Sequence, residues 1–266
     1  MSLRGPLADR YWAAVALVLL ALTPFLALTS AVPALKEAIG PEVGLGEAGL
    51  ELTTAMADAA YCFGTVAAVQ LTQRLPARRP LVAFAALFLI ASVLAAWAPS
   101  AAVFVTGHVL QGLGTSLMLI AVAPTLVIGW PTGKLRPTAV TMNLGIFGAV
   151  ALGPTLGGLF ASWQDWRLLF WIVAGAAAGA LLFSLLTFED AEPQDPEAPV
   201  DVVSLALAAG GCGAAFFGVS RIAEHSFGSL LVLLPLLGGV GMLVALMVHQ
   251  LTVSDPLMPV RKRFGQ

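Results

Sequence analysis

The stretch GIFGAVALGPTLGG, from Gly145 to Gly158, contains a regular pattern of small residues. They recur at every fourth position, at Gly145, Ala149, Gly153 and Gly157. Residues four apart lie on one face of a helix, and a stripe of small residues lets another helix backbone approach closely. Pro154 lacks a backbone N–H and is expected to bend the helix. The stretch therefore predicts a tightly packed helix.

This helix belongs to one of eight apolar runs that are separated by polar breaks. The runs cover residues 11–33, 50–72, 80–98, 101–128, 138–161, 167–188, 202–220 and 228–250. Each is rich in Leu, Ala, Val and Gly, and most approach or exceed the roughly 20 apolar residues that a helix needs to cross a bilayer. They lack the alternation of a strand. We expect an all-α membrane protein with about eight transmembrane helices.

The composition excludes several classes of protein. Of the 266 residues, 59% are hydrophobic and 11% are charged, and the mean hydropathy is +0.91. A soluble domain has roughly 25% charged residues, so a cytosolic globule and a disordered chain are excluded. The net charge of −2 gives no basic surface for nucleic acid, so we expect no nucleic-acid partner.

Motifs for enzymatic chemistry are absent from the sequence. There is no HExxH, GxSxG, CxxC or Walker A pattern. The two cysteines, Cys62 and Cys212, lie inside apolar runs and form neither a disulfide framework nor a metal site of the usual spacing. We expect a protein that is not an enzyme and has no cofactor and no metal.

A short acidic segment divides the chain. Residues 189–201, EDAEPQDPEAPVD, contain six acids and three prolines and no basic residue, which is typical of a solvated linker. The predicted organisation is a six-helix N-terminal bundle at 1–188, a cytoplasmic linker at 189–201, two additional helices at 202–250 and a basic cytoplasmic tail at 251–266.

The basic residues predict the orientation in the membrane, because Lys and Arg gather in cytoplasmic loops. With the N-terminus inside, ten of the thirteen fall on the cytoplasmic side: Arg4, Arg10, Arg74, Arg78, Arg79, Lys134, Arg136, Arg261, Lys262 and Arg263. Lys36, Arg167 and Arg221 fall outside. The apolar core from Tyr11 to Leu28 exceeds the ~7–15 residues of a signal peptide, so we expect a retained span. We therefore expect a multi-pass plasma (inner) membrane protein with both termini in the cytoplasm.

Two ionisable residues lie well inside predicted spans. Asp58 is in the second and His108 in the fourth, and charge in hydrocarbon is costly and usually faces a cavity. Either residue can bind and release a proton during transport. Each also has a structural alternative, in which it only hydrogen-bonds a neighbouring helix. Glu51 lies near the outer end of its span and is expected to be solvated, and His225 and His249 are weaker candidates.

Several stretches resemble motifs of the major facilitator superfamily. Gly153, Pro154, Gly157 and Gly158 match the GPxxGG end of its fifth-helix antiporter motif. HVLQGLG, from His108 to Gly114, resembles its RxxQGxG motif and retains Gln111. His108 stands where the family has an arginine that is thought to serve proton coupling. The resemblance implies proton handling at His108 and a polar contact from Gln111 in a substrate cavity. Asp58, chosen for its position inside a span, is the other candidate for proton handling.

Other family motifs are retained only in part. VQLTQRLPARR, residues 69–79, resembles the cytoplasmic latch loop GxLaDRxGRR through Leu71, Arg74 and Arg78, and Arg79 follows. The aspartate of that loop is replaced by Gln73, and the acid of the first-helix motif is also missing. Packing motifs therefore survive while several charged motifs do not.

The resemblance covers essentially the whole chain. The seventh and eighth spans and the peptide DPLMPVRKRF, residues 255–264, are similar to the middle of the fourteen-span drug:proton antiporter branch. The resemblance implies the N-terminal part of a transporter that exports amphipathic drugs or metabolites in exchange for protons across the lipid bilayer.

One bundle alone has no opposing wall for a substrate. Transporters of this type rock two six-helix bundles around a site at the midplane. We therefore expect a second transporter half, from a longer chain, a homodimer or a separate chain, and we expect the glycine stripe to lack a partner in a monomer. The alternative is a transport-inactive split or decayed family member that acts as a membrane partner or scaffold.

Overall fold

The computed structural model describes residues 5–76, 78–128, 130–187, 195–197 and 199–253. In this part of the chain, eight helices are long and apolar enough to cross a membrane. They are α1 (Tyr11–Val43), α2 (Glu47–Arg74), α3 (Arg78–Trp97), α4 (Ala101–Ile128), α5 (Leu135–Ser162), α6 (Trp166–Thr187), α7 (Val202–Ser220) and α8 (Leu230–Thr252). A short 3₁₀ helix, η1 (Thr132–Lys134), precedes α5. The predicted all-α membrane fold is confirmed.

Helix α1 is longer than the sequence predicted. It continues past residue 33 to Val43 and contains Pro24, Pro33 and Pro41. It ends at Gly44, whose φ of 78° is in the left-handed region that glycine adopts at helix ends. Lys36, which we expected in an outer loop, is therefore part of the last turns of α1.

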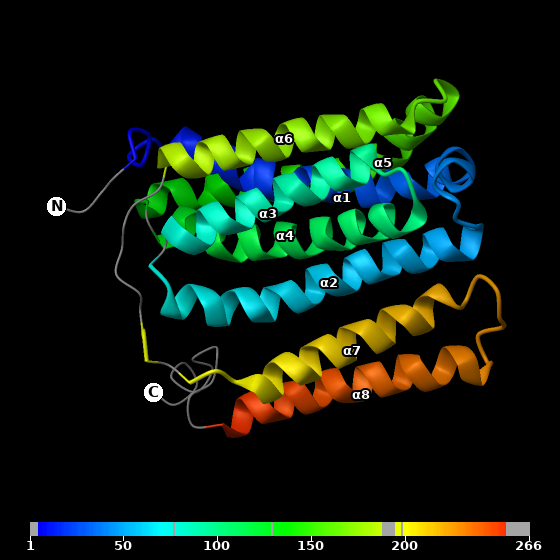
Figure 1. Ribbon diagram of the computed structural model, residues 1–266. Coiled ribbons are helices and arrows are strands. Elements are labelled where there is room, and N and C mark those ends of the chain that lie inside the picture. The colour runs from blue at the N-terminus through cyan, green and yellow to red at the C-terminus, as the bar shows by residue number, and fades with distance from the viewer. Residues whose placement is uncertain (1–4, 77, 129, 188–194, 198, 254–266) are drawn as a thin grey trace.

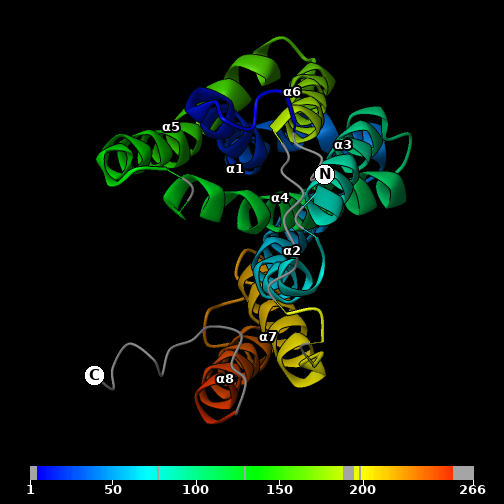
Figure 2. The ribbon, with the colours of Figure 1, turned by 90° about the vertical axis from the view of Figure 1, so that its left-hand side faces the viewer.

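The first six helices form one bundle around α1. In Figure 2, α1 lies between α5 and α6 and above α4, and it packs against all three. Helix α4 also packs against α2 and α3. The largest fully buried side chains include the aromatic rings Trp166, Phe25, Phe88, Phe104 and Phe170. The rings of Phe104, Trp166 and Phe170 contact one another and hold the starts of α4 and α6 together.

The small-residue stripe of α5 packs against α1 within the same chain. A Cβ atom on Gly153 or Gly157 would collide with the α1 backbone, at Ala27 and Ala31 respectively. Ala149 on the same face is buried, whereas Pro154 and Gly158 face outward. The expectation that this stripe lacks a partner in a monomer was therefore wrong, because α1 supplies the partner.

Helices α7 and α8 form an antiparallel pair beside the bundle. Figure 1 shows the pair below α2, and Figure 2 shows α7 between α2 and α8. Helix α7 packs against α2, and α8 packs against α7. Much of α8 is exposed and apolar, including Leu230, Leu234, Leu237 and Met247, a surface that a bilayer would cover.

Several basic residues share one end of the bundle, which we call the basic end. Arg74 ends α2, Arg78 and Arg79 begin α3, and Lys134 ends η1. Helix α6 ends and α7 begins at this same end (Figure 1). Residues 188–194, 198 and 254–266 lie outside the described part, and with them most of the linker and the tail, Arg261, Lys262 and Arg263, and the peptide 255–264; Arg4 also lies outside. The predicted domain boundaries and membrane orientation remain predictions.

Candidate functional site

A cavity of about 520 Å³ lies between α1, α2 and α7. It is lined by Val32, Pro33, Lys36, Glu51, Thr54, Ala55, Asp58, Phe216, Val219, Ser220, Ile222 and Ala223. Most of these side chains are apolar, and the polar ones come from α1 and α2 with one serine from α7. A mostly apolar cavity with a few convergent polar groups is the usual form of a small-molecule site.

Asp58 lies on the face of α2 that borders this cavity. Glu51, Ala55 and Asp58 follow one another at helical spacing, so successive turns of α2 present them to the same space. The side chain of Asp58 is partly buried, and Thr29 of α1 donates a hydrogen bond to its Oδ1 at 3.3 Å. The predicted proton-coupling residue therefore lines a cavity and also contacts a neighbouring helix.

An ion pair borders the same cavity. Lys36 of α1 donates a hydrogen bond to the carboxylate of Glu51, and its Nζ lies 3.5 Å from Glu47. The side chains of Lys36 and Glu51 are only 23% and 21% exposed. Glu51 is therefore ion-paired rather than freely solvated, contrary to our expectation, because α1 extends far enough to bring Lys36 beside it.

The ion pair between Lys36 and Glu51 leaves the charge of Asp58 without a counter-charge in the cavity wall. Among the residues that line the cavity, Lys36 is the one cation, and it is already paired with Glu51. An ionised Asp58 would therefore give the cavity an unbalanced negative charge. A proton or a positively charged group of a ligand would neutralise that charge.

His108 and Gln111 lie elsewhere, in the interior of the bundle. Both are 0% exposed. His108 Nδ1 is 3.0 Å from Gln111 Oε1, and Gln111 Nε2 donates to the Ser92 hydroxyl of α3 at 3.1 Å. The imidazole packs among the rings of Phe25, Phe104 and Phe170. Neither residue lines the cavity beside Asp58, so the structure does not bring the three predicted residues together.

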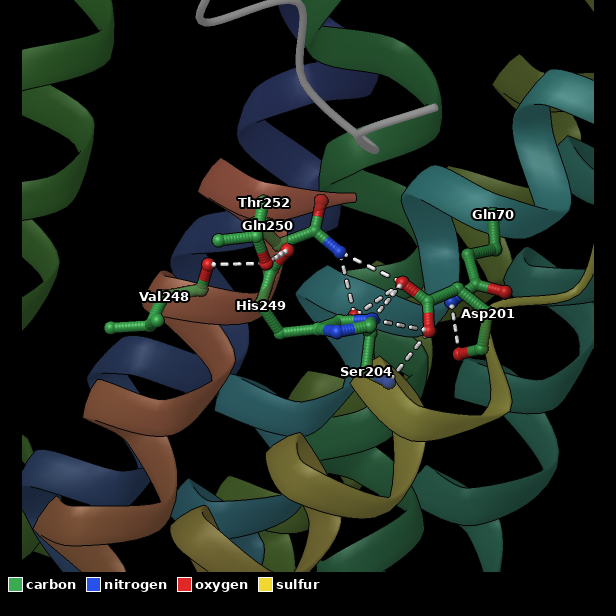
Figure 3. Close-up of polar contacts among 7 residues, drawn as sticks. All are labelled: Gln70, Asp201, Ser204, Val248, His249, Gln250 and Thr252. Carbon is green, nitrogen blue, oxygen red and sulfur yellow. Dashed lines mark hydrogen bonds and ion pairs between the residues drawn. The ribbon is translucent and has the colours of Figure 1, made fainter. Parts of the chain in front are cut away.

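A second polar cluster lies at the basic end and joins three helices (Figure 3). Asp201, at the start of α7, accepts hydrogen bonds from the Ser204 backbone N–H at 2.9 Å, from Gln250 Nε2 at 2.9 Å and from His249 Nε2 at 3.1 Å. Gln70 of α2 donates to the Asp201 carbonyl oxygen at 3.1 Å. We call these five residues the Asp201 cluster; it fixes the start of α7 to the end of α8 and to α2.

The hydrogen bonds change the acidity of Asp201. Partial burial opposes ionisation, but the bonds from the Ser204 hydroxyl and backbone N–H and from His249 outweigh it and hold the pKa of Asp201 below its usual range. Sequence reasoning missed this cluster. A signal was available, since Asp201 directly precedes an apolar run, as helix-capping residues do, and a helical hairpin brings its two ends together.

No group of three or more His, Cys, Asp or Glu side chains in the described part of the chain is arranged to hold a metal ion. The polar groups named above can bind protons, hydrogen-bond a ligand or pair with charge. The site as described therefore supports binding chemistry.

Comparison with known proteins places these features in a family. The sequence profile of the Major Facilitator Superfamily matches residues 14–201. The lincomycin resistance protein LmrB of Bacillus subtilis is 32% identical over 176 residues, which cover 65% of this chain and 36% of LmrB. The drug efflux pump JefA of Mycobacterium tuberculosis is 32% identical over 158 residues, or 57% of this chain and 30% of JefA.

The fold has a solved counterpart. The human organic anion transporter MFSD10 (TETRAN) superposes with a TM-score of 0.54 at 16% identity, over 90% of this chain and 65% of that protein. The chain spans about a third of the length of the two bacterial relatives named above. The profile match covers well over half of the sequence, and the chain belongs to the Major Facilitator Superfamily.

Proposed function

We propose that this chain is part of a proton-coupled exporter of amphipathic compounds, in which Asp58 binds protons and substrate in exchange. The observation that carries the proposal is the position of Asp58 on the wall of a mostly apolar cavity, where the one lining cation is already paired with Glu51. The names of LmrB, a lincomycin resistance protein, and JefA, a drug efflux pump, support export of drug-like molecules.

The proposed exchange uses the charge of one carboxylate. An ionised Asp58 attracts a cationic or hydrogen-bond-donating group of a ligand, while the apolar residues Val32, Phe216 and Val219 contact its apolar part. Protonation of Asp58 removes that attraction and favours release. Thr29 holds one carboxylate oxygen in place, so that the other oxygen is available to the ligand or proton. His108 is the second candidate for proton handling, and Gln111 would act through it.

Transport further requires a second half. Facilitators alternate access by moving two bundles against each other, and the chain spans 36% of the length of LmrB. We propose that a second bundle, from a longer chain, a second copy or another polypeptide, closes the remaining side. The proposed location is the plasma membrane with both termini in the cytoplasm.

The test is proton-driven transport by the complete protein in proteoliposomes, with lincomycin as the probe and an imposed pH gradient. Asp58→Asn keeps the shape of the side chain and removes its charge, so proton-driven transport is expected to be lost. Asp58→Glu is expected to retain part of it. The matched control is Asp165→Asn, because Asp165 caps the start of α6 outside the cavity and asparagine can cap equally well.

Two results would count against the proposal. If Asp58→Asn exported lincomycin with wild-type dependence on the pH gradient, Asp58 would not be the coupling residue. If the wild-type protein neither bound nor moved amphipathic probes, the transport-inactive alternative would be favoured instead.

A further inference from the structure

The two cysteines of the chain lie on facing helices. Cys62 is on α2 and partly buried, and Cys212 is on α7 and 6% exposed. Nothing in their spacing of 150 positions along the sequence pairs them, and the proposed export mechanism uses neither. Helices α2 and α7 pack side by side in antiparallel directions, as Figures 1 and 2 show.

The cavity residues define which parts of the two helices are level with each other. Asp58 of α2 and Phe216 of α7 line the same cavity. Cys62 lies four residues after Asp58, and Cys212 lies four residues before Phe216. Because the helices are antiparallel, both steps lead one turn further in the same direction and remain on the same helix faces.

A neighbouring pair of residues supports the same register. Ala55 and Val219 also line the cavity. Ala55 is three residues from Asp58 and Val219 is three residues from Phe216, both on the side away from the cysteines. The register of the two helices therefore places Cys62 and Cys212 on facing sides of α2 and α7, next to the cavity.

We propose that Cys62 and Cys212 are a modification site that forms a reversible disulfide under peroxide and fixes α7 against α2. One thiolate attacks hydrogen peroxide, which gives a sulfenic acid and hydroxide. The second thiol then displaces the sulfenic oxygen as water and forms the S–S bond. In sum, two thiols and one peroxide give one disulfide and two waters, and a dithiol reductant reverses the reaction.

The disulfide would have a direct effect on the cavity. Helix α7 supplies Phe216, Val219 and Ser220 to the wall opposite Asp58. The Asp201 cluster fixes the start of α7 through hydrogen bonds, and the disulfide would fix its middle covalently. Oxidation would therefore prevent movement of this wall relative to α2, whatever ligand the cavity binds.

The test uses the linker between α6 and α7. A protease recognition sequence is inserted within residues 189–194 of the complete protein, and membranes are treated with hydrogen peroxide, quenched with N-ethylmaleimide and digested. Both fragments are expected to run as one joined species on a non-reducing gel and to separate after dithiothreitol. Cys62→Ser and Cys212→Ser are each expected to lose the joined species.

A matched variant checks that the facing geometry causes the reaction. In Cys212→Ser combined with Gly213→Cys, the thiol moves about 100° around α7, to a position with nothing within 4 Å. This variant is expected to give separate fragments after the same oxidation. Separate wild-type fragments after oxidation, or equal joining in the Gly213→Cys variant, would overturn the proposal.

Discussion

A Cβ atom on Gly153 of α5 would lie 2.7 Å from the carbonyl oxygen of Ala27 in α1. Real Cβ atoms essentially never come that close to another atom, and this one would also collide with the Cβ of Ser30, so the backbone of α5 lies directly against α1 at Gly153. The two helices run in the same direction here, and their close contact depends on the absence of a side chain at Gly153.

Gly153→Ala is therefore expected to destabilise the bundle by about 1–3 kcal/mol, because backbone must move to admit the methyl group. The measurement is the thermal unfolding midpoint of the purified protein in detergent. The control is Gly148→Ala on the same helix, where a Cβ would meet nothing within 4 Å. That variant is expected to be neutral or slightly stabilising, since alanine is the better helix former. Equal midpoints for the two variants would refute the close α1–α5 contact.

Asp201 is expected to make stability depend on pH in the acid range. Its pKa is held below the ordinary value of 3.8, so the folded protein binds this proton less readily than the unfolded chain does. The stabilisation is present above that ordinary value and is lost as the pH falls through the lowered pKa. Unfolding midpoints measured from pH 7 down to pH 3 should therefore fall less steeply in Asp201→Asn than in the wild type.

The same variant should also be less stable at neutral pH, by about 1 kcal/mol, because it weakens the cap of α7 and the bonds from α8. Asp195→Asn serves as the control, since Asp195 is exposed and its Oδ1 accepts one local bond from Glu197. If both variants followed the wild-type pH curve, the Asp201 cluster would not contribute to folding.

The buried chain His108–Gln111–Ser92 is expected to behave as one unit. Gln111→Leu removes the amide that bonds both neighbours and should cost about 1–3 kcal/mol, because His108 and Ser92 then lose a buried partner. Ser92→Ala alone should cost less. The double variant should cost clearly less than the sum of the two, which a double-mutant cycle of unfolding midpoints would measure. Strict additivity would show that the bond between Gln111 and Ser92 does not contribute to stability.

The sequence was sufficient to predict the helices but not their pairing. Hydrophobic run length locates each span, yet it cannot say which helix meets the α5 stripe, and we wrongly left that stripe without a partner. Lys36 was misplaced because the apolar run ends at residue 33, whereas α1 continues to its glycine cap at Gly44. Asp58 was chosen as a candidate for proton coupling because a charge inside an apolar run is energetically costly and therefore stands out in the sequence.

The contacts between residues on different helices could not be predicted for a different reason. Asp201 and His249 are 48 residues apart, and their contact exists only because α7 and α8 fold into a hairpin. Cys62 and Cys212 are level with each other only in the antiparallel register of α2 and α7. The capping role of Asp201 has a local signal in the sequence, but the partners that these residues meet on other helices are set by packing.

Helices α7 and α8 pack on the outside of the six-helix bundle, and this position affects how such a transporter can change in evolution. Within the described helices, α7 reaches the bundle mainly through α2, and α8 packs mainly on α7. A gene can therefore acquire or delete this pair as one inserted segment while the six-helix interior stays unchanged. The surfaces that must adapt are the face of α2 beside α7 and the part of α1 that lines the cavity. Gln70, now 4% exposed and bonded to Asp201, would face lipid after such a deletion and would have to be replaced by an apolar residue.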